Sequence, residues 1–226
     1  MTPLVSVIVP IHNGERFLGE ALDSIAAQDY GSVEIIVVDD GSTDGGAALA
    51  AARGVTLIRQ EQRGAGTARN TGVANARGEI LAFLDQDDLW LPAKLRRQVE
   101  LLLAHPGSFC LAQQAYFLDG VERPAWFGKP ELLAADHTGW APSCLAVHKT
   151  TFARVGPFDE RLLHASDLDW FARAKQSGVA MMTPPETLVR RRIHRANESG
   201  RPATMTELFV ALRGAAARKR TTADES

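Results

Sequence analysis

Residues 78–90 read GEILAFLDQDDLW, and this stretch decides the fold that we expect for the chain. Residues 80–84 form a short, uninterrupted apolar run, which is typical of a strand buried on both faces of a parallel sheet. Three carboxylates follow at once, on Asp85, Asp87 and Asp88. Burying three unpaired charges would cost a large free energy, so we expect these side chains at the end of the strand, beside a cleft and a cation.

The three aspartates predict a site for a hard divalent cation. Mg²⁺ and Mn²⁺ prefer oxygen ligands and are commonly held by one or two carboxylates together with substrate phosphates. Open α/β sheets bind their ligands outside the carboxyl ends of the strands, which is where this run ends. A simpler alternative for Asp88 is that it caps a helix beginning at Leu89, because Asp and Pro favour helix starts. That alternative would not account for the other two acids.

The residues before this stretch alternate between strand patterns and helix patterns. We predict strands over 4–9, 33–38, 55–58 and 80–84, and helices over 16–28, 46–53 and 67–76. In the first helix Phe17, Leu22 and Ile25 share one face, and burying each of them contributes about 1.5–3 kcal/mol. This βαβαβαβ order predicts an α/β fold with a Rossmann-like, doubly wound and mostly parallel sheet flanked by helices.

The pattern is less regular after residue 90. We predict helices over 92–103, 150–155, 166–176 and 205–216, strands over 109–118, 144–147, 179–183 and 187–193, and a long loop over 120–139. Long loops are often functional. Without a repeat or a linker, we expect one domain over residues 1–217, with a nucleotide-binding half up to about residue 90, an acceptor half from 91, and a disordered tail over 218–226.

Composition excludes few classes of protein. The chain has 226 residues, 45% of them hydrophobic, and a formal net charge of −2, so no global charge argues for nucleic acid or membrane. No apolar run reaches the length of about 18 residues that a transmembrane helix needs, and the N-terminus lacks the basic region of a signal peptide. Cys110 and Cys144 lack the spacing of a metal site. We expect a cytoplasmic protein, with peripheral attachment to a membrane left open.

Seven segments, read together, resemble the family 2 inverting glycosyltransferases, which have the GT-A fold. In chain order they are SVIVPIHNG (6–14), EIIVVDDGSTDG (34–45), GAGTARNTG (64–72), ARGEILAFLDQDDLW (76–90), VGPFDERL (155–162), SDLDWFARA (166–174) and RRIHRANES (191–199). A DxD triplet alone would be a weak match, since such triplets occur by chance. The ordered set is specific, and it spans nearly the whole chain.

The resemblance implies roles for individual residues. In this family the loop after the first strand and the aspartate after the second hold the nucleotide base. The ARN arginine lies against the nucleotide, and the DxD aspartates hold the ribose and a Mn²⁺ or Mg²⁺ ion. The closing RxHxxNxS segment places a histidine near the metal or the pyrophosphate. The implied nucleotide-sugar ligands here are Pro10, His12, Asn13, Glu15, Asp39, Arg69, Asp85 and Gln86, and the implied metal ligands are Asp87 and His194.

The implied catalytic base is Asp167. The family most often writes Glu-Asp at the start of this later helix, whereas this chain has Ser166-Asp167, so the role of the family's glutamate is in doubt. The residues alone allow a plainer interpretation, in which Asp167 and Asp169 are first-turn acids suited to the positive end of a helix. Asp39 and Asp40 could likewise be caps of the helix that follows them.

The chemistry implied is transfer of a sugar from a nucleotide diphosphate. A divalent ion stabilises the departing diphosphate, and a carboxylate that takes the acceptor's proton accelerates the reaction by about 10²–10⁴-fold. One base and in-line attack predict inversion at the anomeric carbon. UDP is the commonest donor of the family, with GDP and dTDP left open, and the acceptor (a glycan, a lipid-linked group, a small molecule or a peptide) is not readable. The alternatives are a non-catalytic nucleotide-sugar-binding module of this fold and a haloacid-dehalogenase-type phosphatase.

Overall fold

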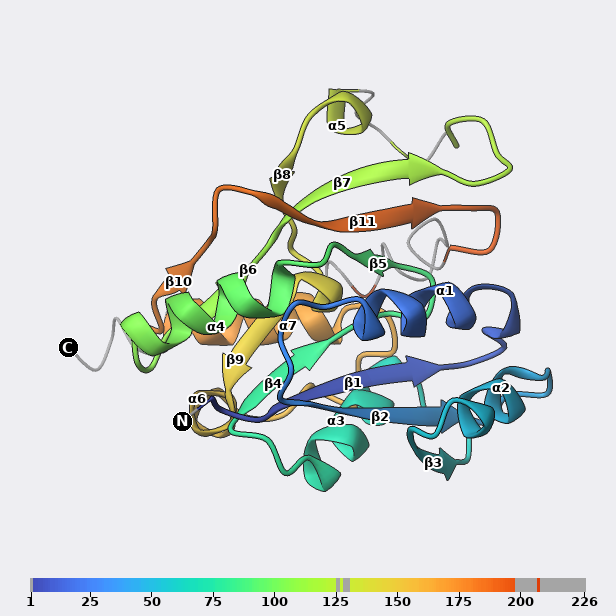
Figure 1. The fold of residues 1–226 in the computed structure, drawn as a ribbon, viewed down its shortest axis with the longest axis horizontal. Helices are drawn as coiled ribbons and strands as arrows, with labels where there is room; N and C mark the ends of the chain where they lie inside the picture. The colour runs from blue at the N-terminus through green and yellow to red at the C-terminus, as the bar shows by residue number, and fades with distance from the viewer. Residues whose placement is uncertain (1, 125–126, 128–130, 198–206, 208–226) are drawn as a thin grey trace.

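Two β-sheets with helices around them form the fold (Figure 1). The computed structural model describes residues 2–124, 127, 131–197 and 207. The helices of this part are α1 Glu15–Ala26, α2 Gly46–Ala52, α3 Ala65–Asn75, α4 Lys94–Ala104, α5 Glu131–Ala134, the 3₁₀ helix η1 Pro142–Cys144, α6 Lys149–Val155 and α7 Ser166–Gln176. The strands are β1 Val5–Ile11, β2 Val33–Asp40, β3 Thr56–Gln60, β4 Ile80–Phe83, β5 Leu89–Trp90, β6 Phe109–Leu111, β7 Gln113–Leu118, β8 His137–Thr138, β9 Leu145–His148, β10 Met181–Met182 and β11 Thr187–Ile193. The predicted helix over 205–216, save residue 207, and the predicted tail over 218–226 lie outside the described residues.

The larger sheet confirms the predicted mostly parallel α/β architecture. Its strand order is β10-β6-β9-β4-β1-β2-β3, and β4, β1, β2 and β3 run parallel to one another. Every residue of β1 and of β4 is buried, as their continuous apolar runs predict for strands at the centre of a parallel sheet. The carboxyl ends of these strands therefore lie together at one edge of the molecule.

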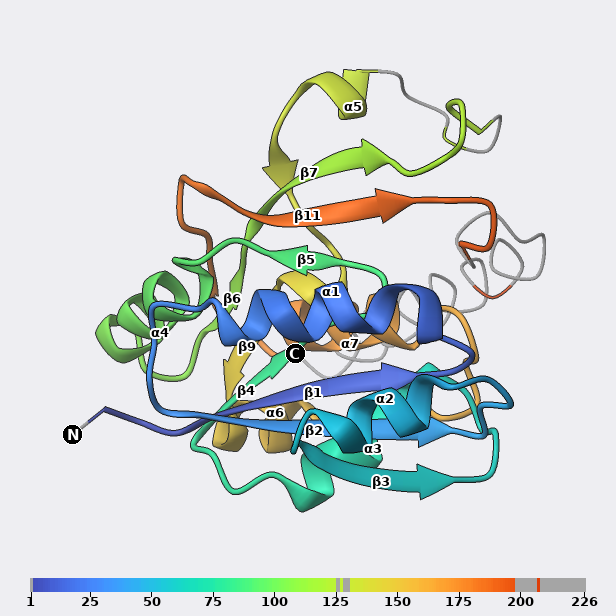
Figure 2. The ribbon, with the colours of Figure 1, turned by 45° about the vertical axis from the view of Figure 1, so that its right-hand side comes forward.

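The smaller sheet has the order β5-β11-β7-β8 and lies above the larger one in Figures 1 and 2, with α1 crossing the front between them. It corrects the single strand that we predicted over 109–118. The chain changes sheet at Ala112, whose N–H donates to the carbonyl of Cys144 and whose carbonyl accepts from the N–H of Gly139. The apolar run is continuous in sequence, but these partners distant in the chain divide it into β6 and β7.

The structure also excludes the alternative that Asp88 caps a helix beginning at Leu89. Leu89 and Trp90 form β5, which pairs antiparallel with β11, and α4 begins only at Lys94 with Ala93 at its N-cap position. The loop predicted over 120–139 contains α5 and β8 in its described part. The helix predicted over 92–103 is confirmed as α4, which begins two residues later than predicted.

Lys94 and Gln98 join α4 to the strands beneath it. The Lys94 side chain is fully buried; its Nζ donates to Gln98 Oε1 at 2.8 Å and lies 3.8 Å from the ring centroid of Trp90. Gln98 Nε2 donates to the carbonyl oxygens of Cys110 and Cys144, at 3.2 and 2.9 Å. Burial lowers the pKa of Lys94 to about 7. These contacts fix the segment around Cys144, which reaches the site described below.

Helix α3 packs closely on β1 through Gly72. A Cβ at this position would overlap the side chain of Ile8, which is fully buried in the central strand. We expect Gly72→Ala to lower the free energy of unfolding by about 1–3 kcal/mol, because the strand cannot move aside. Urea denaturation would measure this change.

A second helical glycine supplies the control for Gly72. In α1 the nearest atom to a Cβ at Gly19 lies 3.8 Å away, so Gly19→Ala should instead raise the stability by up to about 1 kcal/mol through helix propensity. Equal effects of the two substitutions would contradict the close packing of α3 on β1.

Candidate active site

The four residues Asp85–Asp88 at the end of β4 form a turn that is held from several elements of the fold. The turn closes through a hydrogen bond from the N–H of Asp88 to the carbonyl of Asp85, 3.1 Å long. The residues that bind it come from the β1 loop, α3, η1, β11 and the segment after β11. The predicted ligand site at this edge of the sheet is therefore held in place by hydrogen bonds from several elements.

Asp85 is fixed at its side chain and its main chain. Its Oδ1 accepts from Nη2 of Arg69 at 2.6 Å, and its N–H donates to Oγ of Ser143 at 3.1 Å. Nε of Arg69 is buried and has no hydrogen-bond partner among the residues that the structure describes. The structure thus brings together the two residues that we predicted to contact the nucleotide from α3 and from the DxD run.

Gln86 binds the loop that follows β1. Its Oε1 accepts from the N–H of His12 at 2.9 Å, and its Nε2 donates to the carbonyl of His12 at 3.1 Å. His12 Nδ1 in turn lies 3.0 Å from the carbonyl oxygen of Asp40. The predicted nucleotide-sugar ligands Gln86 and His12 are therefore neighbours, but the amide of Gln86 is engaged by protein main chain.

Asn13 and Glu15 connect the same loop to the one after β2. Asn13 Oδ1 accepts from the N–H of Thr43 at 2.8 Å, and Glu15 Oε2 accepts from the N–H of Gly45 at 3.0 Å. Pro10 lies within β1 and pairs with Val38. These predicted ligands line the same edge of the sheet, and the two side chains tie its loops together.

Asp39 and Asp40 do not cap α2, because the N-cap of that helix is Gly45 and has no side-chain hydrogen bond. Asp39 Oδ1 accepts from the N–H of Ser42 at 2.9 Å. Asp40 accepts from the N–H groups of Arg63 and Gly64 at 2.9 and 2.7 Å, and so holds the start of α3. No local pattern indicates this second role, because the partners of Asp40 lie 23 and 24 residues along the chain.

Asp87 faces the segment after β11. Its Oδ2 lies 2.9 Å from Nε2 of His194 and 3.3 Å from Nδ2 of Asn197, and its carbonyl accepts from Nε of Arg192 at 2.9 Å. The ring of Phe17 lies 4.5 Å from the His194 ring, centroid to centroid. The predicted pair of metal ligands is therefore in contact, and Arg192 holds the main-chain carbonyl of Asp87.

The hydrogen bonds of His194 identify its tautomer. The N–H of Ala196 donates to Nδ1 at 3.2 Å, so Nδ1 carries no proton and Nε2 must donate to Asp87. The two predicted metal ligands therefore lie side by side, and ligation of a metal ion by His194 stays a prediction.

Asp88 is buried behind the turn. Its Oδ2 accepts from Oγ of Ser143 at 2.6 Å, its Oδ1 accepts from the N–H of Arg192 at 3.1 Å, and Nε of Arg191 lies 3.4 Å from Oδ2. Burial raises the pKa of Asp88 to about 7, against the opposing charge of Arg191. The third aspartate thus joins the turn to β11 and η1.

Asp167 lies in the first turn of α7. Its Oδ1 accepts from the N–H of Leu168 at 2.9 Å. Burial raises its pKa, the charge of Arg69 lowers it, and the charge of Asp85 raises it, which brings the predicted base into the electrostatic reach of the DxD turn. Asp169 turns away and forms an ion pair with Arg173 at 2.7 Å. The two acids that the sequence could not separate have different surroundings.

The donor atoms at the turn fit a hard divalent ion. Within residues 2–124, 127, 131–197 and 207 no three His, Cys, Asp or Glu side chains form a ready cation cage. Asp85 and Asp87 offer carboxylate oxygens, and Mg²⁺ or Mn²⁺ commonly takes its other ligands from water and substrate phosphates. The site therefore suits an ion that arrives with a phosphorylated substrate.

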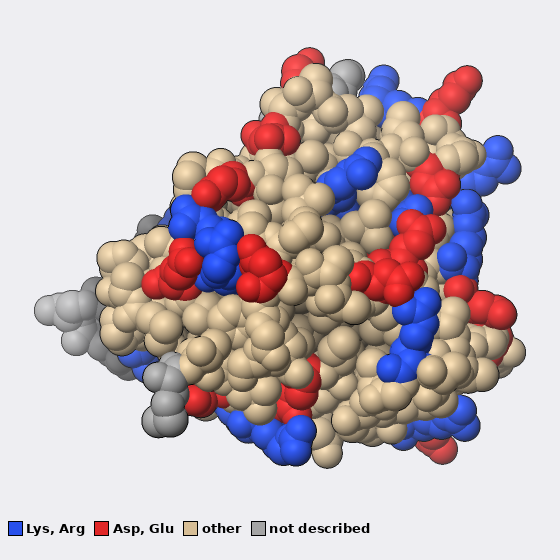
Figure 3. All heavy atoms as spheres, viewed as in Figure 1, with Lys and Arg blue, Asp and Glu red and all other residues tan. Residues whose placement is uncertain are grey.

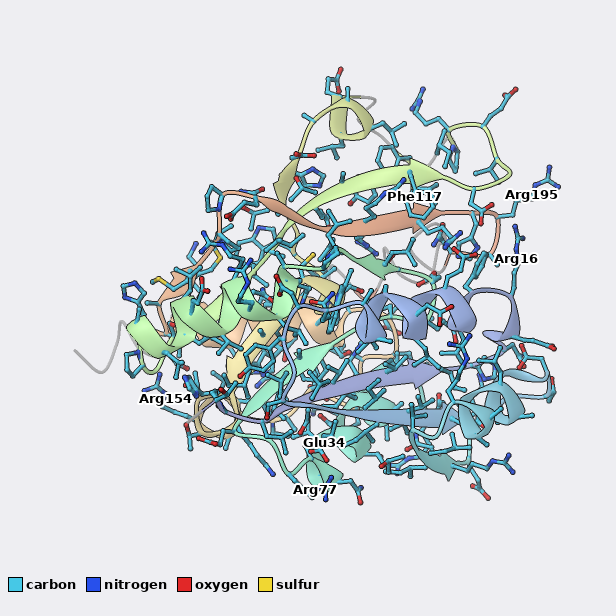
Figure 4. The ribbon with its side chains drawn as sticks, viewed as in Figure 1. Arg16, Glu34, Arg77, Phe117, Arg154 and Arg195 are labelled. Atoms are coloured by element: carbon cyan, nitrogen blue, oxygen red, sulfur yellow. The ribbon has the colours of Figure 1, made fainter. Side chains whose placement is uncertain are left out.

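A groove of about 700 Å³ lies beside His194, lined by Gly120, Val121, Glu122, Pro124, His194 and Arg195. Figure 4 labels Arg195 and Arg16, which project outward at this end of the molecule, beyond the ends of β7 and β11. Acidic and basic side chains alternate over the face in Figure 3 rather than forming one broad patch. The groove borders the turn through His194, which contacts Asp87.

Comparison with known proteins identifies the family. The sequence model described as "Glycosyl transferase family 2" matches residues 6–154. The chain belongs to glycosyltransferase family 2. A protein of Rickettsia typhi described as an uncharacterized glycosyltransferase is 31% identical over 93% of this chain and 70% of its own length. A similar protein of Rickettsia prowazekii is 30% identical with the same coverage.

Solved structures of S. aureus TarS share the fold. The complex of TarS 1–349 with UDP-GlcNAc has a TM-score of 0.77 and 20% identity, and covers 95% of this chain and 66% of that one. The complex with UDP has a TM-score of 0.69 and 21% identity, over 92% of this chain and 65% of that one. The family 2 glycosyltransferase described here thus has the GT-A fold predicted from its sequence, and spans less than two thirds of these TarS chains.

Membership of a glycosyltransferase family supports a transferase and argues against the phosphatase alternative. No helix in the described ranges combines the length and the apolar character that crossing a membrane requires. Sequence reasoning missed Ser143, Arg192 and Asn197 as parts of the site. Arg192 and Asn197 belong to the RxHxxNxS segment, which could have pointed to them, whereas no local signal marked Ser143.

Proposed function

We propose that this glycosyltransferase transfers a sugar from a nucleotide diphosphate sugar, with UDP as the favoured nucleotide, to an acceptor hydroxyl with inversion at the anomeric carbon. The observation that carries the proposal is the convergence of Asp167, Arg69 and Asp85 at the carboxyl end of the parallel sheet. The TarS structures bind UDP and UDP-GlcNAc on the same fold, which supports the nucleotide class but not the sugar.

Different residues bind the donor and activate the acceptor. Asp39, Arg69 and Asp85 face the nucleotide, with Arg69 held in place by its 2.6 Å hydrogen bond to Asp85. Asp167 takes the proton of the acceptor hydroxyl as its oxygen bonds to the anomeric carbon, and the bond from that carbon to the diphosphate breaks on the opposite side. Because one carboxylate acts and no covalent intermediate forms, the configuration inverts.

A divalent cation, Mn²⁺ or Mg²⁺, would be held by Asp85 and Asp87. When bound, it supplies a Lewis acid that stabilises the charge of the departing diphosphate. His194 and Asn197 orient the Asp87 carboxylate through its Oδ2, and Arg192 holds its main chain. Residues that orient a metal ligand in this way strongly influence the affinity for the metal.

The test is a calorimetric titration of UDP, GDP, dTDP and ADP, each with Mn²⁺ and with a chelator. We expect one diphosphate, UDP first, to bind with Mn²⁺ and to bind at least about 10-fold more weakly with the chelator, because a cation held by the carboxylates would offset the negative charge of the diphosphate.

The matching sugar nucleotide would then be assayed for hydrolysis and for transfer. Metal-independent binding would contradict the role of Asp85 and Asp87. Failure of all four diphosphates to bind would contradict the proposed donor class.

A further inference from the structure

We propose that Ser143 is a positioning residue, which holds the Asp85–Asp88 turn in the conformation that binds the donor and its cation. The proposal rests on the proposed function, because it assigns Ser143 to the metal and nucleotide site. It also assigns a role to Asp88, which is to hold Ser143 in place and not to bind the ion.

The hydroxyl of Ser143 makes two hydrogen bonds, one to each end of the turn. Oγ accepts from the N–H of Asp85 at 3.1 Å and donates to Oδ2 of Asp88 at 2.6 Å. Both Ser143 and Asp88 are buried, at 0% and 2% exposure, so water cannot replace either bond without rearrangement. One buried hydroxyl group therefore bridges the first and last residues of the turn, in addition to the main-chain hydrogen bond that closes it.

The main chain of Ser143 is held independently. Its carbonyl accepts from Nε1 of Trp90 at 2.8 Å, and the ring of Trp90 is covered by the buried Lys94 side chain. The carbonyl of the next residue, Cys144, accepts hydrogen bonds from Nε2 of Gln98 and from the N–H of Ala112. Residues of α4 and β5, together with Ala112 just before β7, thus hold Ser143 in place. Ser143 can therefore act as a rigid support for the turn.

The other carboxylate oxygen of Asp88 extends the support to the smaller sheet. Oδ1 accepts from the N–H of Arg192, whose guanidinium donates to the carbonyl of Asp87, Oδ2 of Asp119 and Oε2 of Glu20. The buried Asp88 carboxylate is thus engaged by Ser143, Arg191 and Arg192. Asp88 therefore helps to hold Asp85 and Asp87 in place, and we expect it not to contact the donor.

Ser6 provides a matched control within the same sheet. Its Oγ also accepts a main-chain N–H, from Gly78 at 2.8 Å, and donates to a carboxylate, that of Glu34, and the residue is 0% exposed. It lies near the start of β1, whereas the site lies at the strand's carboxyl end. Figure 4 labels Glu34 and Arg77 together on that side of the molecule, away from Arg16 and Arg195.

The experiment compares Ser143→Ala, Ser6→Ala and Asp88→Asn, alone and as the Ser143/Asp88 double variant. Calorimetry with Mn²⁺ and UDP, or whichever of the four diphosphates the unmodified chain binds, gives the Kd, and thermal melting gives Tm. We expect Ser143→Ala to raise the Kd by about 10–100-fold, Ser6→Ala to leave it within about twofold, and both to lower Tm. The double variant should be little worse than the weaker-binding single variant, because the two residues act through one contact.

Each outcome decides between the roles. Equal Kd values for Ser143→Ala and Ser6→Ala would show a merely structural hydroxyl and overturn the proposal, as would additive losses in the double variant. If Ser143→Ala does not fold, Asp88→Asn decides, with a Kd raised about 10-fold in support and an unchanged Kd against. Failure of the unmodified chain to bind any diphosphate would instead overturn the proposed function.

Discussion

Replacement of Asp167 by asparagine is expected to lower kcat by about 10²–10⁴-fold while leaving nucleotide binding intact. Asparagine keeps the shape of the side chain and its acceptor for the N–H of Leu168, but cannot take the acceptor's proton. The variant should therefore bind the diphosphate and Mn²⁺ with nearly the original Kd. Steady-state transfer assays and calorimetry on the same preparation would separate the two quantities.

Asp169→Asn is the matched control for the base. It removes the same charge from the first turn of the same helix, but Asp169 is paired with Arg173 instead of facing Arg69 and Asp85. We expect it to lower stability and to leave kcat within a few-fold. Near-normal turnover of the Asp167 variant, or equal losses of kcat in both variants, would rule out Asp167 as the base.

The pH dependence of the unmodified enzyme bears on the same assignment. A base must be deprotonated to act, and burial raises the pKa of Asp167 above that of an ordinary aspartate. Activity should therefore fall on acidification at a pH higher than an exposed aspartate would give. The Asp167→Asn variant should lose this acid limb of its residual rate.

Asp87→Asn is expected to abolish the metal dependence of nucleotide binding and to lower kcat/KM by at least about 100-fold. The change removes a charged metal ligand, and a Lewis acid at the diphosphate contributes several kcal/mol, with each 1.4 kcal/mol giving about tenfold in rate. The amide can still accept from His194 and Asn197, so the fold around it should persist. Titration of Mn²⁺ in the presence of UDP would measure the loss.

Asp119→Asn controls for the loss of charge alone. Asp119 is 26% exposed at its side chain, close to the 22% of Asp87, and pairs with Arg192 at 2.8 Å on the same side of the molecule. We expect the Asp119 variant to retain Mn²⁺-dependent binding within a few-fold. If it behaves like the Asp87 variant, the loss of Mn²⁺-dependent binding comes from the changed electrostatic potential of the site and not from the loss of a metal ligand.

The first 90 residues could be predicted well because their structure depends on local patterns. Continuous apolar runs fixed β1, β2 and β4 to within a few residues, and the carboxyl ends of parallel strands must meet at one edge. The neighbourhood of Arg69, Asp85 and Asp167 followed from the family resemblance rather than from spacing. The later helix over 166–176 was also correct, since its first-turn acids and apolar stripe agree.

The features that could not be predicted depend on partners distant in the sequence. Asp88 looks like a helix cap locally, but Ser143 and Arg192, 55 and 104 residues away, determine its environment. The run over 109–118 divides at Ala112 because Cys144 and Gly139 bind there. The tautomer of His194 depends on a main-chain N–H at Ala196, which no residue pattern reveals.

The pairing of β5 with β11 bears on how such enzymes can be recombined. Residue 90 looks like a natural crossover point between a donor half and an acceptor half, yet Trp90 lies in a strand whose partner is Val189. Its ring also binds Ser143 and Lys94 across the same boundary. A chimaera joined at residue 90 would therefore inherit mismatched partners on both sides of the junction, for the strand pair and for the Trp90 ring alike.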